Sequence, residues 1–214
     1  MATVAVIDYG MGNLHSIEKA LKTASPASTV IVSADKNTLL SADHVVFPGV
    51  GAIRDCMAAI HATGLDETIK QIAQEKPLLG ICIGMQALFQ HSEENGGIDC
   101  LGIIPGNVIK FSSHLRDEQK NPLKIPHIGW NEVFFDSKNP LFKNIDENER
   151  FYFVHSYHAS KVEKKYVCAT SNYPEKFPCA IKWKNIVAVQ FHPEKSQRAG
   201  LQLLKNFLNW DGQS

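Results

Sequence analysis

Apolar runs alternate with helical patterns along the first half of the chain. Residues 3–7 form a β-branched apolar run that predicts a buried strand, and apolar residues at helical spacing up to Ala24 predict a helix after it. The other elements predicted in this half are strands at 30–32, 45–47 and 77–81 and helices at 53–60 and 65–73. Because strands that alternate with helices form right-handed βαβ units, this half predicts a parallel sheet with helices on both faces.

The second half of the chain is richer in strands. The strands predicted here lie at 108–111, 131–135, 151–155, 167–171, 180–183 and 186–191. The remaining predictions for this half are a tight hairpin turn at 183–186, a closing helix at 197–209 and an exposed loop over the polar residues 112–124. The whole pattern predicts one α/β domain over residues 1–214, with an open, mixed and mostly parallel sheet.

Length and charge support this prediction and exclude some classes of partner. A chain of 214 residues, 44% of them hydrophobic, can bury the core of one ordinary domain. Lys+Arg and Asp+Glu number 22 each, so the bulk charge gives no indication of nucleic acid or of an anionic membrane surface. The N-terminal residues lack the pattern of a signal peptide, and no apolar run approaches the ~20 residues of a membrane span.

The cysteines favour a reducing compartment. They are an odd number, five, they are widely spaced, and no two form a C-x-x-C pair: Cys56, Cys82, Cys100, Cys168 and Cys179. This argues against a disulfide framework and against a compact zinc site. We therefore expect a cytoplasmic protein in which at least one thiol is kept for its chemistry.

The segment 79–86, L-G-I-C-I-G-M-Q, is the main candidate for a reactive centre. A predicted strand runs directly into a predicted helix, and Gly80 and Gly84 flank Cys82 at two residues on either side. This is the pattern of a nucleophile elbow, where a sharp turn exposes the nucleophile and a helix N-terminus favours the thiolate. The alternative is a buried structural cysteine in a glycine-containing turn.

His192-Pro193-Glu194 follows the last predicted strand and supplies candidate partners for Cys82. Pro193 favours an extended backbone at His192, and residues two apart in an extended segment point to the same side. Glu194 can then orient His192, whose other ring nitrogen is free to take the Cys82 proton. In isolation this tripeptide is more simply a satisfied histidine beside a surface glutamate, but its combination with an elbow cysteine favours catalysis.

Other segments are weaker indications. The loop 47–51, F-P-G-V-G, can aim backbone N–H groups at a developing oxyanion, although it can equally be an ordinary turn after a strand. Gly10-Met11-Gly12 is not taken as a dinucleotide loop, because His15 occupies the third glycine position. His155 and His158 have no carboxylate or cysteine cluster beside them in the sequence, so no metal is expected there.

Taken together, P-G-V-G, G-I-C-I-G-M-Q and V-Q-F-H-P-E resemble the class I (triad) glutamine amidotransferases, and the match spans most of the chain. Within that family, D-Y-G-M-G-N, P-H-I-G-W-N and Y-F-V-H-S-Y resemble the glutaminase subunits of imidazole glycerol phosphate synthases. The resemblance implies hydrolysis of L-glutamine to L-glutamate and ammonia, without a cofactor. It also implies a heterodimer with a cyclase subunit, a (β/α)8 barrel, which uses the ammonia in histidine biosynthesis to make imidazole glycerol phosphate and AICAR.

The resemblance also assigns roles to residues. It implies that Cys82 is the nucleophile, His192 the base and Glu194 the residue that orients it. The other implied roles are the oxyanion strand for Gly49 and Val50, glutamine binding for Gln86, Ser156 and Tyr157, and the partner interface for Asn13 and Trp130. Ile83 stands where leucine is more usual in the family, a near-isosteric change. Trp130 could instead be a simple core residue.

Other functions remain open at this stage. The chain could be the glutaminase subunit of a different amidotransferase, serving pyridoxal phosphate synthesis or the amination of a surface sugar. It could also be a Cys hydrolase that acts alone on peptides or γ-glutamyl compounds. A binding module without activity is disfavoured, because Cys82, His192 and Glu194 are all present.

Overall fold

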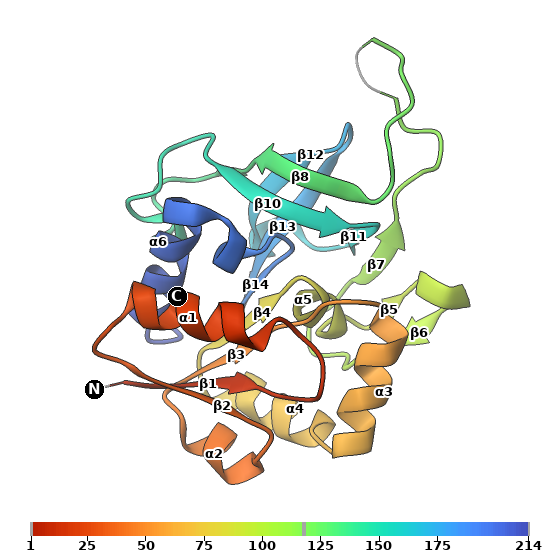
Figure 1. Cartoon of the computed structure of the whole chain (residues 1–214). Helices are drawn as coiled ribbons and strands as arrows, with labels where there is room; N and C mark the ends of the chain where they lie inside the picture. Colours follow the sequence, from red (N-terminus) through yellow and green to blue (C-terminus); the bar gives the residue numbers. More distant parts are fainter. Residues whose placement is uncertain (1, 117–118, 214) are drawn as a thin grey trace.

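A mixed eight-stranded sheet forms the centre of the computed structural model, which describes residues 2–116 and 119–213 (Figure 1). The strand order is β2-β1-β3-β4-β14-β13-β12-β9. The first part of this order is parallel: β2 (Thr29–Ser33), β1 (Thr3–Ile7), β3 (His44–Phe47), β4 (Leu78–Ile81) and β14 (Ile186–Val189). The antiparallel remainder is β13 (Lys176–Trp183), β12 (Val167–Asn172) and β9 (Phe134–Phe135).

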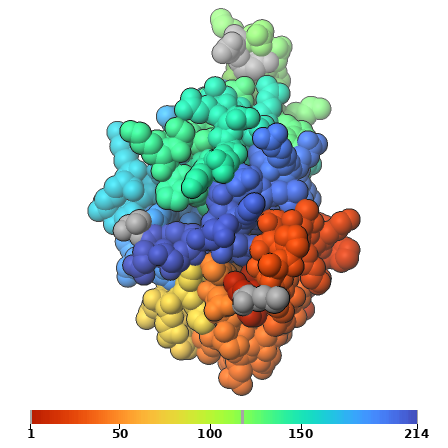
Figure 2. Space-filling view, turned by 90° about the vertical axis from the view of Figure 1, so that its left-hand side faces the viewer, coloured from red at the N-terminus to blue at the C-terminus, as the bar shows by residue number. Residues whose placement is uncertain are grey.

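Helices cover both faces of the parallel part, as the alternation of strands and helices predicts. They are α1 (Leu14–Ala24), α2 (Lys36–Ser41), α3 (Ile53–Thr63), α4 (Asp66–Glu75), α5 (Ile83–Ala87) and α6 (Gln197–Leu208). In Figure 1, α1 and α6 lie on one side of the parallel strands and α2 and α4 on the other. Figure 2 shows the C-terminal residues, in blue, against the N-terminal ones, in red, because α1 packs on α6.

Local chemistry explains where these helices begin and end. The Asp35 side chain accepts a hydrogen bond from the Thr38 N–H and so caps α2. At the other end of a helix, α3 stops at Gly64, whose φ of +64° is the left-handed conformation that glycine adopts without strain. The helix α1 buries Ile17, Ala20 and Leu21 against the sheet, which is the apolar face that its sequence pattern predicts.

Two smaller sheets beside the main one were not predicted. One pairs β10 (Arg150–His155) with β8 (His127–Glu132), and the other has the order β11-β7-β5-β6. The bounds in the second are β11 (Tyr157–Ser160), β7 (Asn107–Lys110), β5 (His91–Ser92) and β6 (Ile98–Asp99). The helix α2 and the strands β5, β6 and β11 have no counterpart among the predicted elements, because they are too short or too polar to give a periodic signal.

The strand predicted at 131–135 is wrong in its bounds. The structure divides that segment between the end of β8 and the two-residue β9. The first strand begins earlier, at His127, where polar residues and Gly129 alternate with the exposed side chains of Ile128 and Trp130. A two-stranded sheet at the surface needs no continuous apolar run, so the pattern did not reveal its start.

Two predictions for the second half of the chain are confirmed. Trp183 pairs with Ile186 across a tight turn, and Lys184 in that turn has a φ of +54°. Residues 112–116 and 119–124 project from the body of the molecule (Figure 1), and most of their side chains are exposed. Residues 117 and 118 of this prediction lie outside the described residues. No helix in the described ranges is long and apolar enough to cross a membrane.

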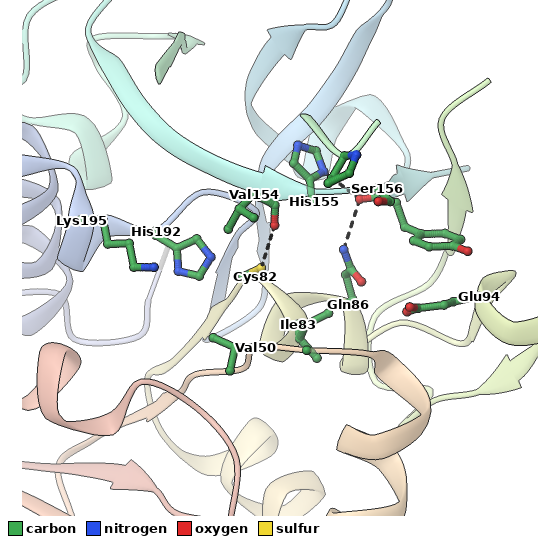
Figure 3. Close-up of a pocket in the computed structure, with 13 residues that line it drawn as sticks. Val50, Cys82, Ile83, Gln86, Glu94, Val154, His155, Ser156, His192 and Lys195 are labelled. Atoms are coloured by element: carbon green, nitrogen blue, oxygen red, sulfur yellow. Dashed lines mark hydrogen bonds between the residues drawn. The ribbon is translucent and has the colours of Figure 1, made fainter. Parts of the chain in front are cut away.

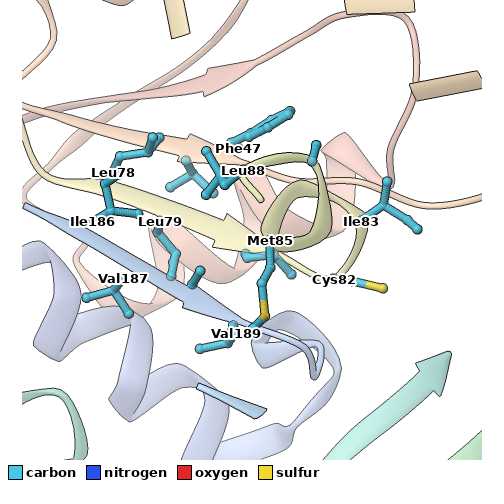
Figure 4. Close-up of a cluster of buried hydrophobic side chains, with 14 of the residues drawn as sticks. Phe47, Leu78, Leu79, Cys82, Ile83, Met85, Leu88, Ile186, Val187 and Val189 are labelled. Carbon is cyan, nitrogen blue, oxygen red and sulfur yellow. The ribbon is translucent and has the colours of Figure 1, made fainter. Parts of the chain in front are cut away.

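Buried side chains of β4, β14 and α5 form one hydrophobic cluster next to Cys82. Figure 4 shows Leu79 of β4, Val189 of β14 and Met85 of α5 packed together, with Cys82 at the edge of this cluster. Met85 and Leu79 are fully buried. The core therefore fixes the position of the turn that carries Cys82 from both sides.

Candidate active site

Cys82 lies in the sharp turn between β4 and α5. Its φ of +54° and ψ of −110° are a conformation that a residue with a side chain rarely adopts. The turn is held by the Cys82 N–H, which donates to the Val189 carbonyl at 2.8 Å, and by the Cys82 carbonyl, which accepts from the Gln86 N–H at 3.1 Å. This backbone strain is the strain expected of a nucleophile elbow.

The two glycines around Cys82 are required by close backbone approaches. A Cβ at Gly84 would collide with the Phe47 carbonyl oxygen, so β3 and α5 can touch only through a glycine. A Cβ at Gly80 would lie 2.8 Å from a Leu88 methyl group. A side chain would therefore clash at both positions, and Gly84 meets the less yielding neighbour.

The helix after Cys82 is shorter than the sequence pattern suggested. The structure ends α5 at Ala87, before the apolar Leu88 and Phe89. So short a helix has a weak dipole, because the dipole is the sum of few aligned peptide units. Electrostatic help for a thiolate at Cys82 must come mainly from a charged side chain.

His192 and Glu194 form a buried pair beside the elbow. His192 Nδ1 lies 2.8 Å from Glu194 Oε1, and each side chain is 2% exposed. The predicted backbone conformation of this segment is partly wrong. His192 is extended, but Pro193–Lys195 is a short 3-10 helix, η4, in which Lys195 N–H donates to the His192 carbonyl at 3.0 Å. This turn places the Glu194 carboxylate beside the His192 ring, whereas the sequence predicted an extended segment with both side chains on the same side.

The other ring nitrogen of His192 is the one that faces Cys82. Within the described ranges His192 Nε2 has no completed hydrogen bond, and Figure 3 shows the ring beside the Cys82 sulfur. Burial lowers the pKa of His192, but the neighbouring Cys82 and the hydrogen bond to Glu194 outweigh it and raise the pKa to about 10. The site thus favours a protonated His192 imidazole beside Cys82.

A cavity of about 380 Å³ opens beside Cys82. This volume lies in the range typical of small-molecule sites. Six of the residues singled out from the sequence line it, namely Val50, Cys82, Gln86, Ser156, Tyr157 and His192. Glu194 does not line this cavity. It lines a second, narrow cavity, which has no room for a water molecule, with Asn13, Gly49, Val50 and His192.

Gln86 presents an unused acceptor to the cavity. Its Nε2 donates to the Tyr157 carbonyl at 3.2 Å and to Gln190 Oε1 at 3.0 Å. Since both partners are acceptors, the amide orientation is fixed, and Gln86 Oε1 is buried without a partner among the described groups. An unsatisfied buried oxygen at a cavity wall is a place for a ligand N–H group.

The glycine loop Pro48–Gly51 lies against the elbow. A Cβ at Gly49 would be 2.6 Å from the Gly84 nitrogen, so the two backbones touch. Tyr9, which is 1% exposed, holds the start of this loop: its hydroxyl donates to the Pro48 carbonyl at 2.9 Å. Tyr9 thus helps to hold the candidate oxyanion loop in position.

Several groups at the site were not singled out from the sequence. Gln190 Nε2 donates to Cys82 Sγ at 3.7 Å, and Cys82 Sγ donates to the Val154 carbonyl at 3.9 Å. Both are weak bonds to sulfur. Gln190 stands in V-Q-F-H-P-E two residues before His192, and that spacing in a predicted strand could have indicated a side chain near the site. No sequence signal could reveal a backbone carbonyl such as that of Val154.

Two predicted residues lie away from the cavity. Trp130, on β8, is 44% exposed and is therefore not a core residue. Asn13, directly before α1, is half-buried beside the narrow cavity. His155 and His158 do not form a metal site with other side chains: among the described residues no group of three or more His, Cys, Asp or Glu could hold an ion.

The profile of one protein family, glutamine amidotransferase class-I, matches residues 5–210. The chain belongs to this family. Solved structures show the same fold at low identity. PurLQS from Thermotoga maritima superposes with a TM-score of 0.72 at 18% identity, covering 98% of this chain and 99% of the other. A structure titled glutamine amidotransferase gives 0.72 at 16% identity, covering 96% and 97%.

Curated relatives of this class-I glutamine amidotransferase are much more similar. The imidazole glycerol phosphate synthase subunit HisH of Methylococcus capsulatus is 54% identical over 212 residues, covering 99% of this chain and 98% of the relative. The protein of the same name from Pseudomonas putida is 52% identical, covering 99% of both chains. The cavity beside Cys82 is thus the candidate glutamine site of a class-I amidotransferase.

Proposed function

We propose that this chain is the glutaminase subunit of an imidazole glycerol phosphate synthase. The observation that supports it best is the arrangement of Cys82 on a strained elbow, beside the buried His192–Glu194 pair and at the wall of a cavity large enough for glutamine. The full-length similarity to the named HisH subunits supports the choice of pathway. Residues 1–214 then act as one glutamine amidotransferase domain.

The first half of the reaction forms a thioester. The Cys82 thiolate attacks the side-chain carbonyl carbon of glutamine, and the carbonyl oxygen becomes an oxyanion. His192, protonated in the resting pair, gives its proton to the amide nitrogen, the C–N bond breaks, and ammonia leaves. Glu194 keeps the ring oriented and stabilises the imidazolium, as their 2.8 Å contact allows.

The second half returns the enzyme to its starting state. Neutral His192 takes a proton from water, and the hydroxide attacks the γ-glutamyl thioester. The C–S bond breaks, glutamate leaves, and the Cys82 thiolate again faces a protonated His192. The sum is glutamine plus water giving glutamate plus ammonia, so no oxidant, metal or other reactant enters the balance.

The oxyanion is assigned to backbone donors on two segments. Val50 and Ile83 both line the cavity beside Cys82, and an N–H group of the residue after the nucleophile is a usual donor in an elbow. Gly49 allows the Val50 segment to touch the elbow, because any side chain there would meet the Gly84 nitrogen. The loop therefore has the backbone contact that an oxyanion donor needs.

Glutamine recognition is assigned to Gln86 of α5 and to residues at the start of β11. Gln86 Oε1 is the acceptor left for an N–H group of the substrate. Ser156, in the bend between β10 and β11, and Tyr157, the first residue of β11, line the same cavity. This proposal agrees with the roles implied by the family resemblance.

The partner is assigned as a cyclase subunit, a (β/α)8 barrel, bound in a heterodimer. The surface strand β8 presents large apolar side chains, with Ile128 58% and Trp130 44% exposed. Asn13 lies at the narrow cavity that reaches Glu194, so a partner seated there would be close to the site where ammonia forms. Released ammonia would pass across this interface without meeting bulk solvent. We also place the protein in the cytoplasm, since all its cysteines are free thiols.

A single substitution tests the function. Cys82→Ala in the complex with the cyclase subunit should abolish synthesis of imidazole glycerol phosphate from glutamine but retain synthesis from ammonium salts, because the cyclase needs ammonia and not the thiol. Cys100→Ala is the matched control, since this half-buried thiol does not line the cavity. Substantial glutamine hydrolysis by Cys82→Ala would contradict the assignment of the nucleophile.

The same complex separates the related functions. A complex that releases glutamate but forms no imidazole glycerol phosphate with either nitrogen source would belong to another amidotransferase pathway. Full hydrolysis by the isolated chain, with no change on adding the partner, would instead indicate a hydrolase that acts alone.

A further inference from the structure

A buried histidine pair lies behind the glutamine-binding wall, and the catalytic steps above do not use it. His127 begins β8, His155 ends β10, and the two residues are paired across the two-stranded sheet. His127 Nδ1 and His155 Nε2 are 2.9 Å apart, and the side chains are buried, at 4% and 6% exposure. His155 also lines the cavity (Figure 3).

Every ring nitrogen of the pair has a partner, and the partners fix the direction of each bond. His155 Nδ1 lies 2.8 Å from the Tyr157 carbonyl, which can only accept, so Nδ1 carries the hydrogen. Neutral His155 then accepts at Nε2 from His127 Nδ1–H. His127 accepts in turn at Nε2 from the Asn131 side-chain amide at 3.2 Å. The result is one directed chain of hydrogen bonds from Asn131 to the Tyr157 carbonyl.

The surroundings keep both rings neutral. Burial lowers the pKa of His127 to about 4 and that of His155 to about 3. The His127 ring stacks on Tyr173 at 4.0 Å and on Phe153 at 5.0 Å, so the pair is surrounded by aromatic rings. Neutral imidazoles each have one donor and one acceptor, which is the combination that the chain of bonds requires.

This series of hydrogen bonds ends at the wall of the glutamine-binding cavity. The Tyr157 carbonyl accepts from His155 Nδ1 and also from Gln86 Nε2 at 3.2 Å. Its two lone pairs are therefore both used. The carbonyl that the histidine pair orients is thus one of the two acceptors that fix the orientation of the Gln86 amide.

We propose that His127 and His155 are positioning residues for glutamine binding: as a hydrogen-bonded pair they hold the Tyr157 carbonyl, and through it the orientation of the Gln86 amide. This inference rests on the proposed glutaminase function. The pair contacts the cavity wall and not the reacting bond, so its loss should weaken substrate binding more than it slows the chemistry.

The test compares substitutions that keep or remove one hydrogen-bonding position. His155→Leu removes both ring nitrogens, whereas His155→Asn can place an amide N–H near the Nδ1 position and keep the bond to Tyr157. His127→Leu and His127→Asn make the same comparison at the histidine that donates to His155. His158→Leu is the matched control, since His158 packs on Phe111 in the same cluster but its Nδ1 contacts the Ala159 carbonyl instead of the Tyr157 carbonyl.

The readout is saturable labelling of Cys82 by a diazoketone analogue of glutamine, with the chain alone and with the cyclase subunit. The diazo carbon takes the acidic proton of the thiol–imidazole pair, and the thiolate then displaces N2 to form the C–S bond. The concentration for half-maximal labelling reports binding, and the limiting rate reports chemistry. The labelled fraction counts folded sites, and thermal unfolding checks stability.

His155→Leu should raise the half-maximal concentration by about 10-fold, the worth of one well-placed hydrogen bond, and change the limiting rate by less than about 3-fold. His155→Asn should recover most of the binding. Effects of His127→Leu and His155→Leu should not add in the double variant, because both interrupt the same series of hydrogen bonds. His158→Leu should bind the analogue like wild type.

Other results would overturn the inference. If His155→Leu binds the analogue normally and only the labelled fraction falls, the pair is a packing element alone. If His155→Leu does not fold, the His127 variants decide, and equal binding by His127→Leu and wild type rejects the role. Failure of wild type to be labelled overturns the proposed function, and this inference with it, whereas labelled wild type with normal variants rejects the inference only.

Discussion

The two walls of the candidate site are built in different ways. The parallel part of the main sheet supplies Cys82 after β4 and His192 after β14, both at the carboxyl ends of neighbouring strands. The two-stranded β8–β10 sheet and the bend before β11 supply backbone carbonyls and a buried histidine pair. The first wall holds reactive side chains on a rigid core, and the second recognises substrate through oriented polar groups.

This comparison makes a general prediction about variants. Substitutions in the parallel wall should act mainly on the limiting rate, because they touch the reacting groups. Substitutions in the β8–β10 wall should act mainly on substrate affinity. The predictions that follow are ordered from the largest expected effect to the smallest.

His192→Ala should lower the rate of glutamine hydrolysis by about 10²–10⁴-fold, the usual worth of general acid–base help. Glu194→Ala should cost less, because the carboxylate orients the ring and does not itself move the proton. Rates of glutamate release in the complex, with the affinity for glutamine measured in parallel, check both. Equal losses in the two variants would show that Glu194 has more than an orienting role.

Gly84→Ala should lower activity by about 10²-fold, since a displacement of ~1 Å at a catalytic group can cost that much. The added methyl group would collide with the Phe47 carbonyl and push α5 away from β3. Gly80→Ala is the matched comparison, because its methyl meets the movable end of Leu88 at 2.8 Å. Activity and unfolding temperature should fall further in Gly84→Ala, and a reversed order would refute the close-approach explanation.

Gln86→Leu tests the residue of α5 whose amide is bonded to the Tyr157 carbonyl of the other wall. It removes the buried acceptor Oε1 and both donated bonds, so the KM for glutamine should rise by about 10-fold or more while kcat changes less. Steady-state kinetics in the complex measure the two constants separately. A loss confined to kcat would contradict the assignment of Gln86 to substrate binding.

Tyr9→Phe should have a smaller effect, which appears in both stability and rate. The variant keeps the ring that packs edge-on against Phe47 but leaves the buried Pro48 carbonyl without its donor. We expect a loss of about 1–2 kcal/mol in unfolding free energy and a lower kcat with little change in KM. Cys56→Ala, which loses only the 3.6 Å thiol contact to the same hydroxyl, is the control.

Acid pH should weaken the β8–β10 wall. The pKa values of His127 and His155 are lowered in the fold, to about 4 and 3, so below pH ~6.5 the unfolded chain binds protons that the folded chain does not. Each histidine should cost about 1 kcal/mol of stability between pH 6.5 and 5.5. Denaturant unfolding of wild type and His155→Leu checks this: the variant should lose less stability over that range.

His192 should act in the opposite direction. Its pKa is raised to about 10, so its stabilising contribution is complete below pH ~6.5 and is lost as the pH rises toward 10. The same denaturant series, extended to alkaline pH with His192→Ala, should show a flatter profile for the variant. The two walls thus have opposite pH responses.

The amino-acid sequence by itself determined the parallel part of the fold and the main reactive residues. Apolar runs locate β1, β3 and β4, since burial on both faces leaves a strong signal. Cys82 between two glycines predicts the elbow because few other arrangements need that spacing. Asn131 and the strand start at His127 gave no such signal, because a two-stranded surface sheet has no fixed apolar pattern.

Tertiary structure alone decided the rest of the site. His127 and His155 are 28 residues apart, and only the antiparallel pairing of β8 with β10 brings their rings within 2.9 Å. The Val154 and Tyr157 carbonyls belong to the backbone, which is the same in every sequence, so no residue pattern can indicate which of them faces a cavity. The sequence gives the chemistry of each side chain directly, whereas the pairing of strands decides the direction of a backbone group.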